Sequence, residues 1–499
     1  MSGIDPVYLL GTIIIYFSLL YLVSYFTGRD ADNQTFFNAN RNSSWILVAI
    51  GMIGASLSGV TFISIPGVVG AGETNQAFSY MQMVFGYLLG YAVIAFVLMP
   101  IYYKYQLTSI YGYLNSRFGT TSYKWGAFYF LLSRVIGASF RLYLVAIVLH
   151  PFVLQPMGIS FELTVIVTLA LIWIYTFRGG IKTIVWTDTL QTLTMISAVV
   201  FTLYYIADGI GIGFLDIPGL IRESDYSQMF FFENGWSDPN NFFKQVISGM
   251  LIAVVMTGLD QDMMQKNLSC RSLGEAQKNV GLFSIILVFA NLLFLGLGAC
   301  LYIYAAENGI AIPEKTDQLF PLIALNHLAP FVGVIFVLGL IAAAYSSADS
   351  ALTSLTTSFC VDFLGFENSA KDELSKRKIR LAVHLAFTLL LLIVILAFNT
   401  LNNDAVINGL FKVAAYTYGP LLGLYSMGIF TKISIRDSYV WIVVLTAPVL
   451  SYILDSNSEE WFNGLNFGFF ILAINGALTF IGLLLISRKA STELNPDSV

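Results

Sequence analysis

An apolar stretch at 341–362 carries many oxygen-bearing side chains that could bind a small cation. Seven hydroxyls and one carboxylate fall within residues 346–357: Ser346, Ser347, Ser350, Thr353, Ser354, Thr356, Thr357 and Asp349. Ala343, Ser346 and Ser350 recur at spacings of three and four, so oxygens line much of one helical face. Uncharged oxygens with one or two carboxylates suit a small hard cation, whereas thiolate and imidazole suit transition metals. Hydrogen bonding between helices is the alternative, but it does not account for Asp349.

The stretch 44–70 concentrates glycine and hydroxyl residues in the same way. It contains glycine at 51, 54, 59, 67 and 70, together with Ser56, Ser58, Thr61, Ser64 and Pro66. Close packing of small residues between helices is one reading. A broken helix, whose freed carbonyls line a cavity, explains both the helix-weakening and the hydroxyl residues, and is the reading that we favour.

A carboxylate lies two turns inside another apolar stretch, 183–207. This residue is Asp188, which follows the cytoplasmic Arg178 and Lys182. An ionisable group at membrane depth costs several kcal/mol, about 2.5–3.5 on insertion scales, unless it is paired or hydrated. Asp188 is therefore either in a salt bridge with Lys182 or Arg141, or a cation ligand or gate carboxylate.

Other charged or polar groups stand near or inside apolar stretches. Asp260, Gln261 and Asp262 end the stretch 242–263, where they are either solvated by the cytoplasm or part of a gate. Three basic residues fall inside expected spans: Arg134, Arg141 and Lys412. These three could neutralise buried carboxylates or contact an anionic substrate.

The composition excludes most soluble functions. The 499 residues are 57% hydrophobic and only 11% charged, with a mean hydropathy of +0.75, against roughly 25% charged residues in ordinary soluble domains. A soluble enzyme, a nucleic-acid binder and a disordered scaffold are therefore excluded. The three cysteines and three histidines are scattered, and no grouping of ionisable side chains indicates a membrane enzyme or an organic cofactor.

Thirteen apolar segments of spanning length predict an all-α polytopic membrane protein. They are 7–26, 45–70, 77–103, 122–149, 159–177, 183–207, 242–263, 279–305, 331–361, 379–398, 404–431, 438–455 and 465–487. The first has the wrong flanks for a signal peptide and is expected to be retained. With the N-terminus outside, nineteen of the 25 Lys and Arg residues, Lys266 among them, fall in cytoplasmic connections. This segregation also places the C-terminus in the cytoplasm.

At these residues the chain resembles the sodium:solute symporter family, which includes sodium–sugar, proline and sialic acid transporters. The likeness rests on four motifs in order: ASLSGVTFISIP, RGGIKTIVWTDTLQ, DQDMMQK and AAAYSSADS. The resemblance implies one transmembrane domain with two inverted five-helix repeats, of the LeuT-like kind, at 45–207 and 242–431. The helix at 7–26 precedes the repeats, extra helices follow at 438–487, and the binding site lies at the break in 45–70.

The resemblance also implies the site residues. The main sodium site matches the carbonyls of Gly54, Leu57 and Ala343 and the hydroxyls of Ser346 and Ser347. A possible second sodium site matches Asp188, Ser346, Asp349 and Ser350, with Asp349 standing where the family has a serine. The substrate pocket matches Ser56, Ser58 and Thr61, with Gln82 opposite.

The solute does not follow from the resemblance. The arginine that pairs with the sialic acid carboxylate in such transporters matches a position near Gly137. The glutamate and glutamine that follow the helix break in sodium–sugar symporters are Val60 and Thr61 here. Sialic acid, glucose and galactose are therefore not carried over to this chain.

The sequence thus predicts a secondary active transporter in the inner membrane of a bacterium, working as a monomer. We expect it to couple sodium entry to uptake of a small polar solute such as a sugar, sugar acid, amino acid or vitamin. A proton-coupled symporter, with Asp188 or Asp349 titrating, is the alternative within the same fold. A channel or a non-transporting sensor is the alternative from another class, but neither repeated pore segments nor an output domain are visible.

Overall fold

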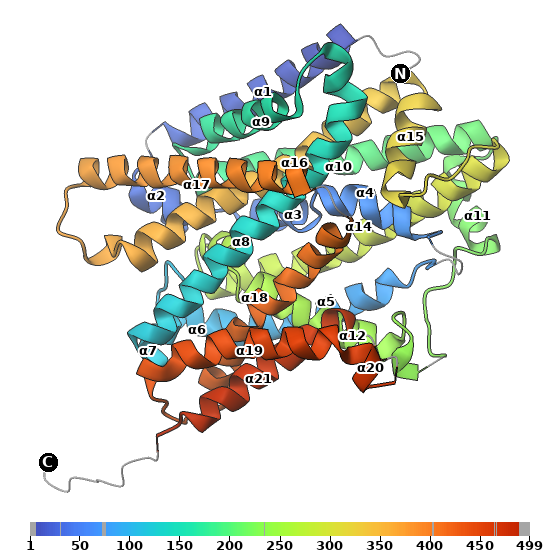
Figure 1. The fold of residues 1–499 in the computed structure, drawn as a ribbon. Coiled ribbons are helices and arrows are strands. Elements are labelled where there is room, and N and C mark those ends of the chain that lie inside the picture. The colour runs from blue at the N-terminus through green and yellow to red at the C-terminus, as the bar shows by residue number, and fades with distance from the viewer. Residues whose placement is uncertain are drawn as a thin grey trace, which may run out of the picture.

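The computed structural model describes residues 6–29, 31–71, 76–233, 235–401, 404–463, 465 and 467–488, and this part of the chain is nearly all helical (Figure 1). The helices are α1 (Pro6–Gly28), α2 (Asn33–Asn38), α3 (Trp45–Ser56), α4 (Gly59–Val68), α5 (Tyr80–Val93), α6 (Met99–Lys104), α7 (Gly112–Arg117), α8 (Thr120–Leu149), α9 (Phe161–Thr176), α10 (Ile181–Ile210), α11 (Ile217–Glu223), α12 (Phe242–Ala253), α13 (Gln261–Leu268), α14 (Leu273–Glu307), α15 (Leu319–Asn326), α16 (Pro330–Ser358), α17 (Glu373–Leu401), α18 (Asp404–Phe430), α19 (Val440–Ser456), α20 (Ser458–Trp461) and α21 (Ile471–Leu485). Two π-helical segments, η2 (Ile94–Leu98) and η7 (Val254–Gly258), continue α5 and α12.

Each of the thirteen predicted ranges overlaps a helix or a bent helix pair. Within the described residues, nine helices are long and apolar enough to cross a membrane, and two bent pairs bring the number to as many as eleven. α9 is a shorter apolar helix, and α18 covers the predicted range 404–431. The all-α polytopic architecture is confirmed, whereas the count of thirteen spans stays a prediction.

The predicted break in the stretch 45–70 is confirmed. α3 and α4 form a pair bent by 62°. Leu57 (φ −84°, ψ 75°) ends α3, and the extended Ser58 (φ −66°, ψ 173°) precedes α4. The chain leaves helical geometry where glycine and serine weaken it most.

A second break, which the sequence reading did not predict, interrupts the range 242–263. The segment Phe242–Gly258 and α13 meet at 65°. Asp260 is extended (φ −110°, ψ 122°) and caps α13, because its carboxylate accepts the Asp262 N–H at 2.9 Å. The first helix of each predicted repeat is therefore broken.

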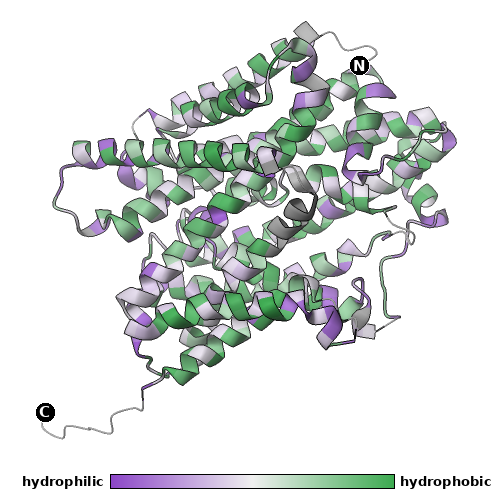
Figure 2. Cartoon of the chain, viewed as in Figure 1, coloured by the Kyte–Doolittle hydropathy of each residue, from purple (hydrophilic) through white to green (hydrophobic). Residues whose placement is uncertain are grey.

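α16 forms the centre of the bundle. In its 18-residue apolar segment 78% is buried, and the helix packs against α10, α8, α3 and α4. α1 and α9 lie on one side of the bundle, and α19 and α21 lie on the other (Figure 1). Figure 2 shows hydrophobic residues along the helices and hydrophilic residues gathered towards the two ends of the bundle, as expected for a membrane-spanning protein.

Candidate functional site

The two helix breaks lie beside each other inside the bundle. Tyr91 on α5 lies near both breaks, with its phenol oxygen close to the hydroxyls of Ser56, the last residue of α3, and of Thr257, near the end of η7. The last carbonyls of a helix have no partner within that helix. Two helix ends that meet at one depth therefore supply backbone oxygens for a bound ion or solute.

Two of the residues that the resemblance assigns to the main sodium site, Gly54 on α3 and Ser346 on α16, lie close together beside α10. A Cβ placed on Gly54 would lie 2.6 Å from Thr192 Oγ1 and 3.0 Å from Ser346 Oγ, so only glycine allows this approach. The Gly54 N–H donates to Thr192 Oγ1 at 2.9 Å. The start of α4 also lies against α16, because a Cβ on Gly59 would be 3.7 Å from Ala344.

Ser347 has a feature expected of an ion ligand. Its side chain is buried, yet its Oγ atom has no hydrogen-bond partner among the described residues. A buried hydroxyl without a partner costs roughly 1–3 kcal/mol. A cation bound beside Ser346 would give this oxygen a partner, so the donor chemistry fits sodium at this position.

The side chains assigned to the possible second sodium site form hydrogen bonds with three different residues. Ser346 Oγ donates to Asp188 Oδ1 at 2.7 Å, whereas Ser350 Oγ donates to Asp262. Asp349 Oδ2 accepts the Tyr175 hydroxyl at 2.7 Å, and its other oxygen has no partner among the described residues. Only Asp188 and Ser346 are in direct contact within this set.

The cation that neutralises Asp188 is neither Lys182 nor Arg141. Lys266 Nζ lies 2.6 Å from Asp188 Oδ2, and both side chains are almost fully buried. The expectation that Lys266 belongs to a cytoplasmic connection is therefore wrong. Lys266 reads as a surface residue in the sequence because basic residues follow it closely, but α13 folds back into the bundle.

The expectation that the cytoplasm could solvate Asp260, Gln261 and Asp262 is also wrong, because all three are buried. Arg134 on α8 bridges the two carboxylates, at 2.5 Å from Asp260 Oδ1 and 2.9 Å from Asp262 Oδ2. The Tyr418 hydroxyl donates to Asp260 Oδ2 at 2.5 Å. The Gln261 amide donates to the Thr108 carbonyl at 2.8 Å and accepts the Ile110 N–H at 2.9 Å. These bonds hold the start of α13 against the helices around it.

Arg141 is placed differently from Arg134. It is half-buried on α8 and forms no hydrogen bond or ion pair with another residue in the part of the chain that the structure describes. Val145, four residues further on, contacts the first break, because a Cβ on Gly59 would overlap its Cγ2 atom. Arg134, seven residues earlier, pairs with Asp260 at the second break. Residues four and seven positions apart lie on one helical face. Arg141 therefore lies on the face of α8 that contacts both breaks, between Arg134 and Val145.

The predicted solute residues are only partly available. Ser56 and Thr61 are half-buried near the first break, and Ser58 is buried. Gln82 instead holds the long outer loop: its Oε1 accepts the Phe231 N–H at 3.0 Å, and its Nε2 donates to the Asn240 carbonyl at 2.8 Å. Lys412 lies on α18, and its side chain is outside the described part of the structure.

The comparison with family models decides the family. The model of the sodium:solute symporter family matches residues 36–434. The chain belongs to this family. A sodium/sialic acid symporter, NanT of Aliivibrio fischeri, is 24% identical over 466 residues, 91% of this chain and 89% of that protein. The human sodium/iodide cotransporter is 25% identical over 425 residues, 81% of this chain and 62% of that protein.

The fold agrees with this family. The structure of a sodium-coupled sialic acid symporter in a substrate-bound outward-open state superposes with a TM-score of 0.81, at 20% identity, over 96% of this chain and 98% of that one. The protein is therefore a multi-pass membrane transporter, and not an enzyme, that couples sodium to the uptake of a small solute. The sequence-based resemblance to the family is confirmed.

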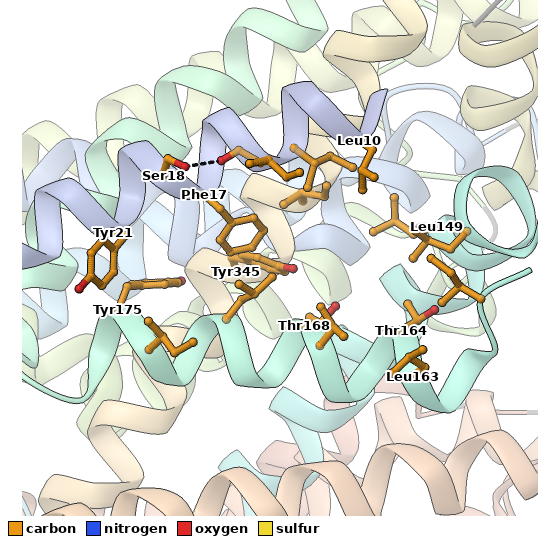
Figure 3. A pocket seen from close by; sticks show the side chains of 18 of the residues that line it. Leu10, Phe17, Ser18, Tyr21, Leu149, Leu163, Thr164, Thr168, Tyr175 and Tyr345 are labelled. Carbon is orange, nitrogen blue, oxygen red and sulfur yellow. Dashed lines mark hydrogen bonds between the residues drawn. The ribbon is translucent and has the colours of Figure 1, made fainter. Parts of the chain in front are cut away.

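A cavity of about 660 Å³ in this symporter lies away from the helix breaks, between α1, α9 and the outer part of α16 (Figure 3). Its lining is almost entirely apolar and carries no charged side chain. Leu10 and Ile14 on α1 and Leu163 on α9 are exposed at its rim, so it opens towards lipid. Tyr175 lines this cavity and also donates to Asp349, which separates the apolar space from the buried carboxylates.

Proposed function

We propose that this symporter couples sodium entry to the uptake of a small organic anion across the inner membrane of a bacterium. In this proposal it works as a monomer, with its N-terminus outside and its C-terminus in the cytoplasm. The observation that carries the proposal is Arg141, a half-buried guanidinium without a described partner, on the α8 face between the two helix breaks.

A guanidinium at membrane depth needs a counter-charge. Leaving one unpaired at that depth costs several kcal/mol, and Arg141 forms no ion pair with Asp260 or Asp262, whose carboxylates bond Arg134 instead. A carboxylate on the solute would supply the missing charge in a bidentate geometry that guanidinium groups favour. The two relatives support this assignment, because sialic acid and iodide, for which they are named, are both anions.

Sodium in this proposal binds at the first break. Its ligands are the carbonyls of Gly54, Leu57 and Ala343 and the hydroxyls of Ser346 and Ser347. Support comes from the approach of Gly54 to Ser346 and from the unpartnered Ser347 hydroxyl. Because Ser346 donates its proton to Asp188, its lone pairs stay available to a cation.

The solute in this proposal binds beside that sodium, between the breaks. The hydroxyls of Ser56, Ser58 and Thr61 contact its polar groups, and Arg141 binds its carboxylate. Gln82 is left out of these contacts because its amide is committed to the outer loop.

Release to the cytoplasm requires α13 to move. All eight residues of α13 are buried, so this half-helix closes the cytoplasmic side in the present conformation. Its bonds to Arg134 and Asp188 lie on either side of the passage, and we assign Asp260 and Gln261 to the gate.

The experiment is a binding and uptake series with matched solutes. The thermal unfolding midpoint of the purified protein is measured in sodium or potassium, with small carboxylates and with their neutral amides. Each carboxylate that raises the midpoint is then tested, together with its amide, for uptake into proteoliposomes under a sodium gradient. We expect stabilisation and uptake only with sodium and a carboxylate. Uptake of the amide equal to that of the acid would refute the anion assignment, and accumulation driven by protons without sodium would favour the proton-coupled alternative.

Gly54→Ala is expected to weaken sodium binding strongly. The added methyl would meet Thr192 Oγ1 at 2.6 Å and push α3 away from Ser346. Overpacking costs about 1–3 kcal/mol, which is roughly 5- to 150-fold in affinity. The measurement is the sodium concentration that gives half of the maximal thermal stabilisation. Gly137→Ala on α8, where a Cβ meets nothing within 4 Å, is the control and should bind sodium like the wild type.

Ser347→Ala is expected to raise the sodium concentration for half-maximal binding while leaving the fold intact. Removing one neutral oxygen ligand costs about 1 kcal/mol, or roughly fivefold in affinity. Ser354→Ala is the matched control on the same helix, because the Ser354 hydroxyl is already bonded to the Ala351 carbonyl at 2.9 Å. Equal sodium affinities of the two variants would remove Ser347 from the ligand set.

A further inference from the structure

A buried lysine lies where a second cation would be expected. Lys266 Nζ is 2.6 Å from Asp188 Oδ2, and the exposed fractions of the two side chains are 1% and 0%. Lys266 stands in the last turn of α13, where the helix dipole favours a positive charge. The ammonium is thus fixed at a defined point inside the bundle, and it is not a surface charge.

The partner carboxylate is continuous with the proposed sodium site. Asp188 Oδ1 accepts the Ser346 hydroxyl at 2.7 Å, and Gln191, with its amide in the orientation that suits its neighbours, donates to the same oxygen at 3.1 Å. A Cβ on Gly51 would lie 3.0 Å from Asp188 Cβ, so the carboxylate packs against α3 one turn before Gly54. Asp188 and Ser346 would supply hard oxygen ligands to a cation that took the place of the ammonium.

Two cations do not fit beside Asp188 together. Two unit charges 4 Å apart repel by about 4 kcal/mol at an effective dielectric constant of 20. Asp188 compensates one of them. Of the other two carboxyl groups in this region, Asp262 is paired with Arg134 and bonded by Ser350, and Asp349 accepts the Tyr175 hydroxyl. A sodium ion at Asp188 therefore requires the ammonium to leave.

We propose that Lys266 is a tethered cation that fills the second cation position of this symporter, so that one sodium ion is bound in each transport cycle. The inference rests on the proposed sodium site at Gly54 and Ser346. Lys266 supplies the charge that would otherwise come from a second ion, and it moves with α13 when the cytoplasmic side opens. Removing the ammonium while keeping Asp188 creates a second sodium site.

The experiment counts sodium ions on the purified full chain by equilibrium binding of ²²Na⁺. The Hill coefficient of binding cannot exceed the number of sites, so a value above one independently requires more than one site. We expect one ion in the wild type and in Lys266→Arg, about two ions in Lys266→Met, and one again in Lys266→Met/Asp188→Asn. The double variant is the matched control because it also lacks the buried lysine but does not provide the Asp188 carboxylate.

Two outcomes overturn the proposal: two ions in the wild type, or one ion in a Lys266→Met variant that elutes as a single folded species. If Lys266→Met does not fold, Asp188→Asn decides. With a tethered cation, this variant keeps one ion and needs more sodium for half-saturation, because the ammonium has lost its partner. If Asp188 instead holds a second sodium, the count falls from two to one. Absence of ²²Na⁺ binding by the wild type would refute the main sodium site itself. Transport of a neutral solute would refute the anion assignment but would not change the expected sodium counts.

Discussion

Arg141→Met is expected to weaken binding of the anionic solute strongly while leaving sodium binding unchanged. Hydrogen bonds to charged groups contribute about 1.5–3 kcal/mol, so loss of the guanidinium lowers solute affinity by roughly 10- to 150-fold. Sodium affinity is retained because Arg141 is on α8 and is not among the proposed sodium ligands on α3 and α16. The measurement is the binding of one carboxylate and of its amide, each at saturating sodium.

The pattern across the two ligands is the decisive readout. The wild type should prefer the carboxylate, and Arg141→Met should bind both ligands weakly and alike. Arg141→Lys should fall between them, because lysine keeps the charge but loses the bidentate fork. Arg271→Met is the control, since Arg271 is exposed and bonds Asn42 at the surface. A carboxylate preference that survives in Arg141→Met would contradict the proposed role.

The broken helix at 45–70 was predictable because its signal is local. Glycine and hydroxyl residues at that density weaken a helix by backbone entropy and by competing hydrogen bonds, whatever the rest of the chain does. The break falls at Leu57 and Ser58, inside the expected cluster. The hydroxyl-rich face of α16 is a local pattern of the same kind, and it faces α3 and α10 as a cation site would need.

The second break has a weaker local signal. The residues Gly258, Leu259 and Asp260 place a helix-weakening residue before a good capping residue, which is the pattern that starts a new helix. The apolar content of 242–263 hides this pattern, because hydropathy registers length and polarity but not a capping geometry. The Asp260 cap, with its bond from the Asp262 N–H, becomes visible only in the structure.

The charge partners could not be predicted, because pairing depends on tertiary structure. In sequence, Lys266 stands 78 positions from Asp188, and Arg134 stands 126 positions from Asp260. A basic residue at the end of an apolar stretch reads as a cytoplasmic anchor by the positive-inside rule. The rule still predicts the orientation of the chain, but it failed at Lys266, because the half-helix α13 is buried in the bundle after the break.

In the proposed orientation, the same contacts account for closure of the cytoplasmic side. α13 is fixed on one side by Arg134 on α8 and on the other by Asp188 on α10. Ser350 on α16 donates to Asp262 between them. These bonds are ionic or charge-assisted, and they are buried. They are strong when both partners are present, and removing one partner leaves a buried charge uncompensated. When the gate opens in each cycle, each of these charged groups must therefore form a new ion pair or hydrogen bond in place of the one that it loses.

Arg134→Met is expected to be the most destabilising single substitution in this region. It leaves the buried carboxylates of Asp260 and Asp262 without their cation, and removal of one partner of a buried ion pair costs about 3–5 kcal/mol. The remaining donors are the Tyr418 and Ser350 hydroxyls and the Asp262 N–H, which are all neutral. We expect a large loss of folded protein and a lower midpoint of thermal aggregation in detergent.

Neutralising the carboxylates separates the charge effect from lost packing. Arg134→Met/Asp260→Asn/Asp262→Asn should recover most of the thermal midpoint, because no buried charge is then left without a partner. Sodium binding should return with it, since Gly54, Ser346 and Ser347 are untouched, whereas solute uptake should stay low because the gate has lost the bonds that close it. A triple variant as unstable as Arg134→Met would show that the arginine acts through its packing on α8, and that charge compensation of α13 is not what closes the cytoplasmic side.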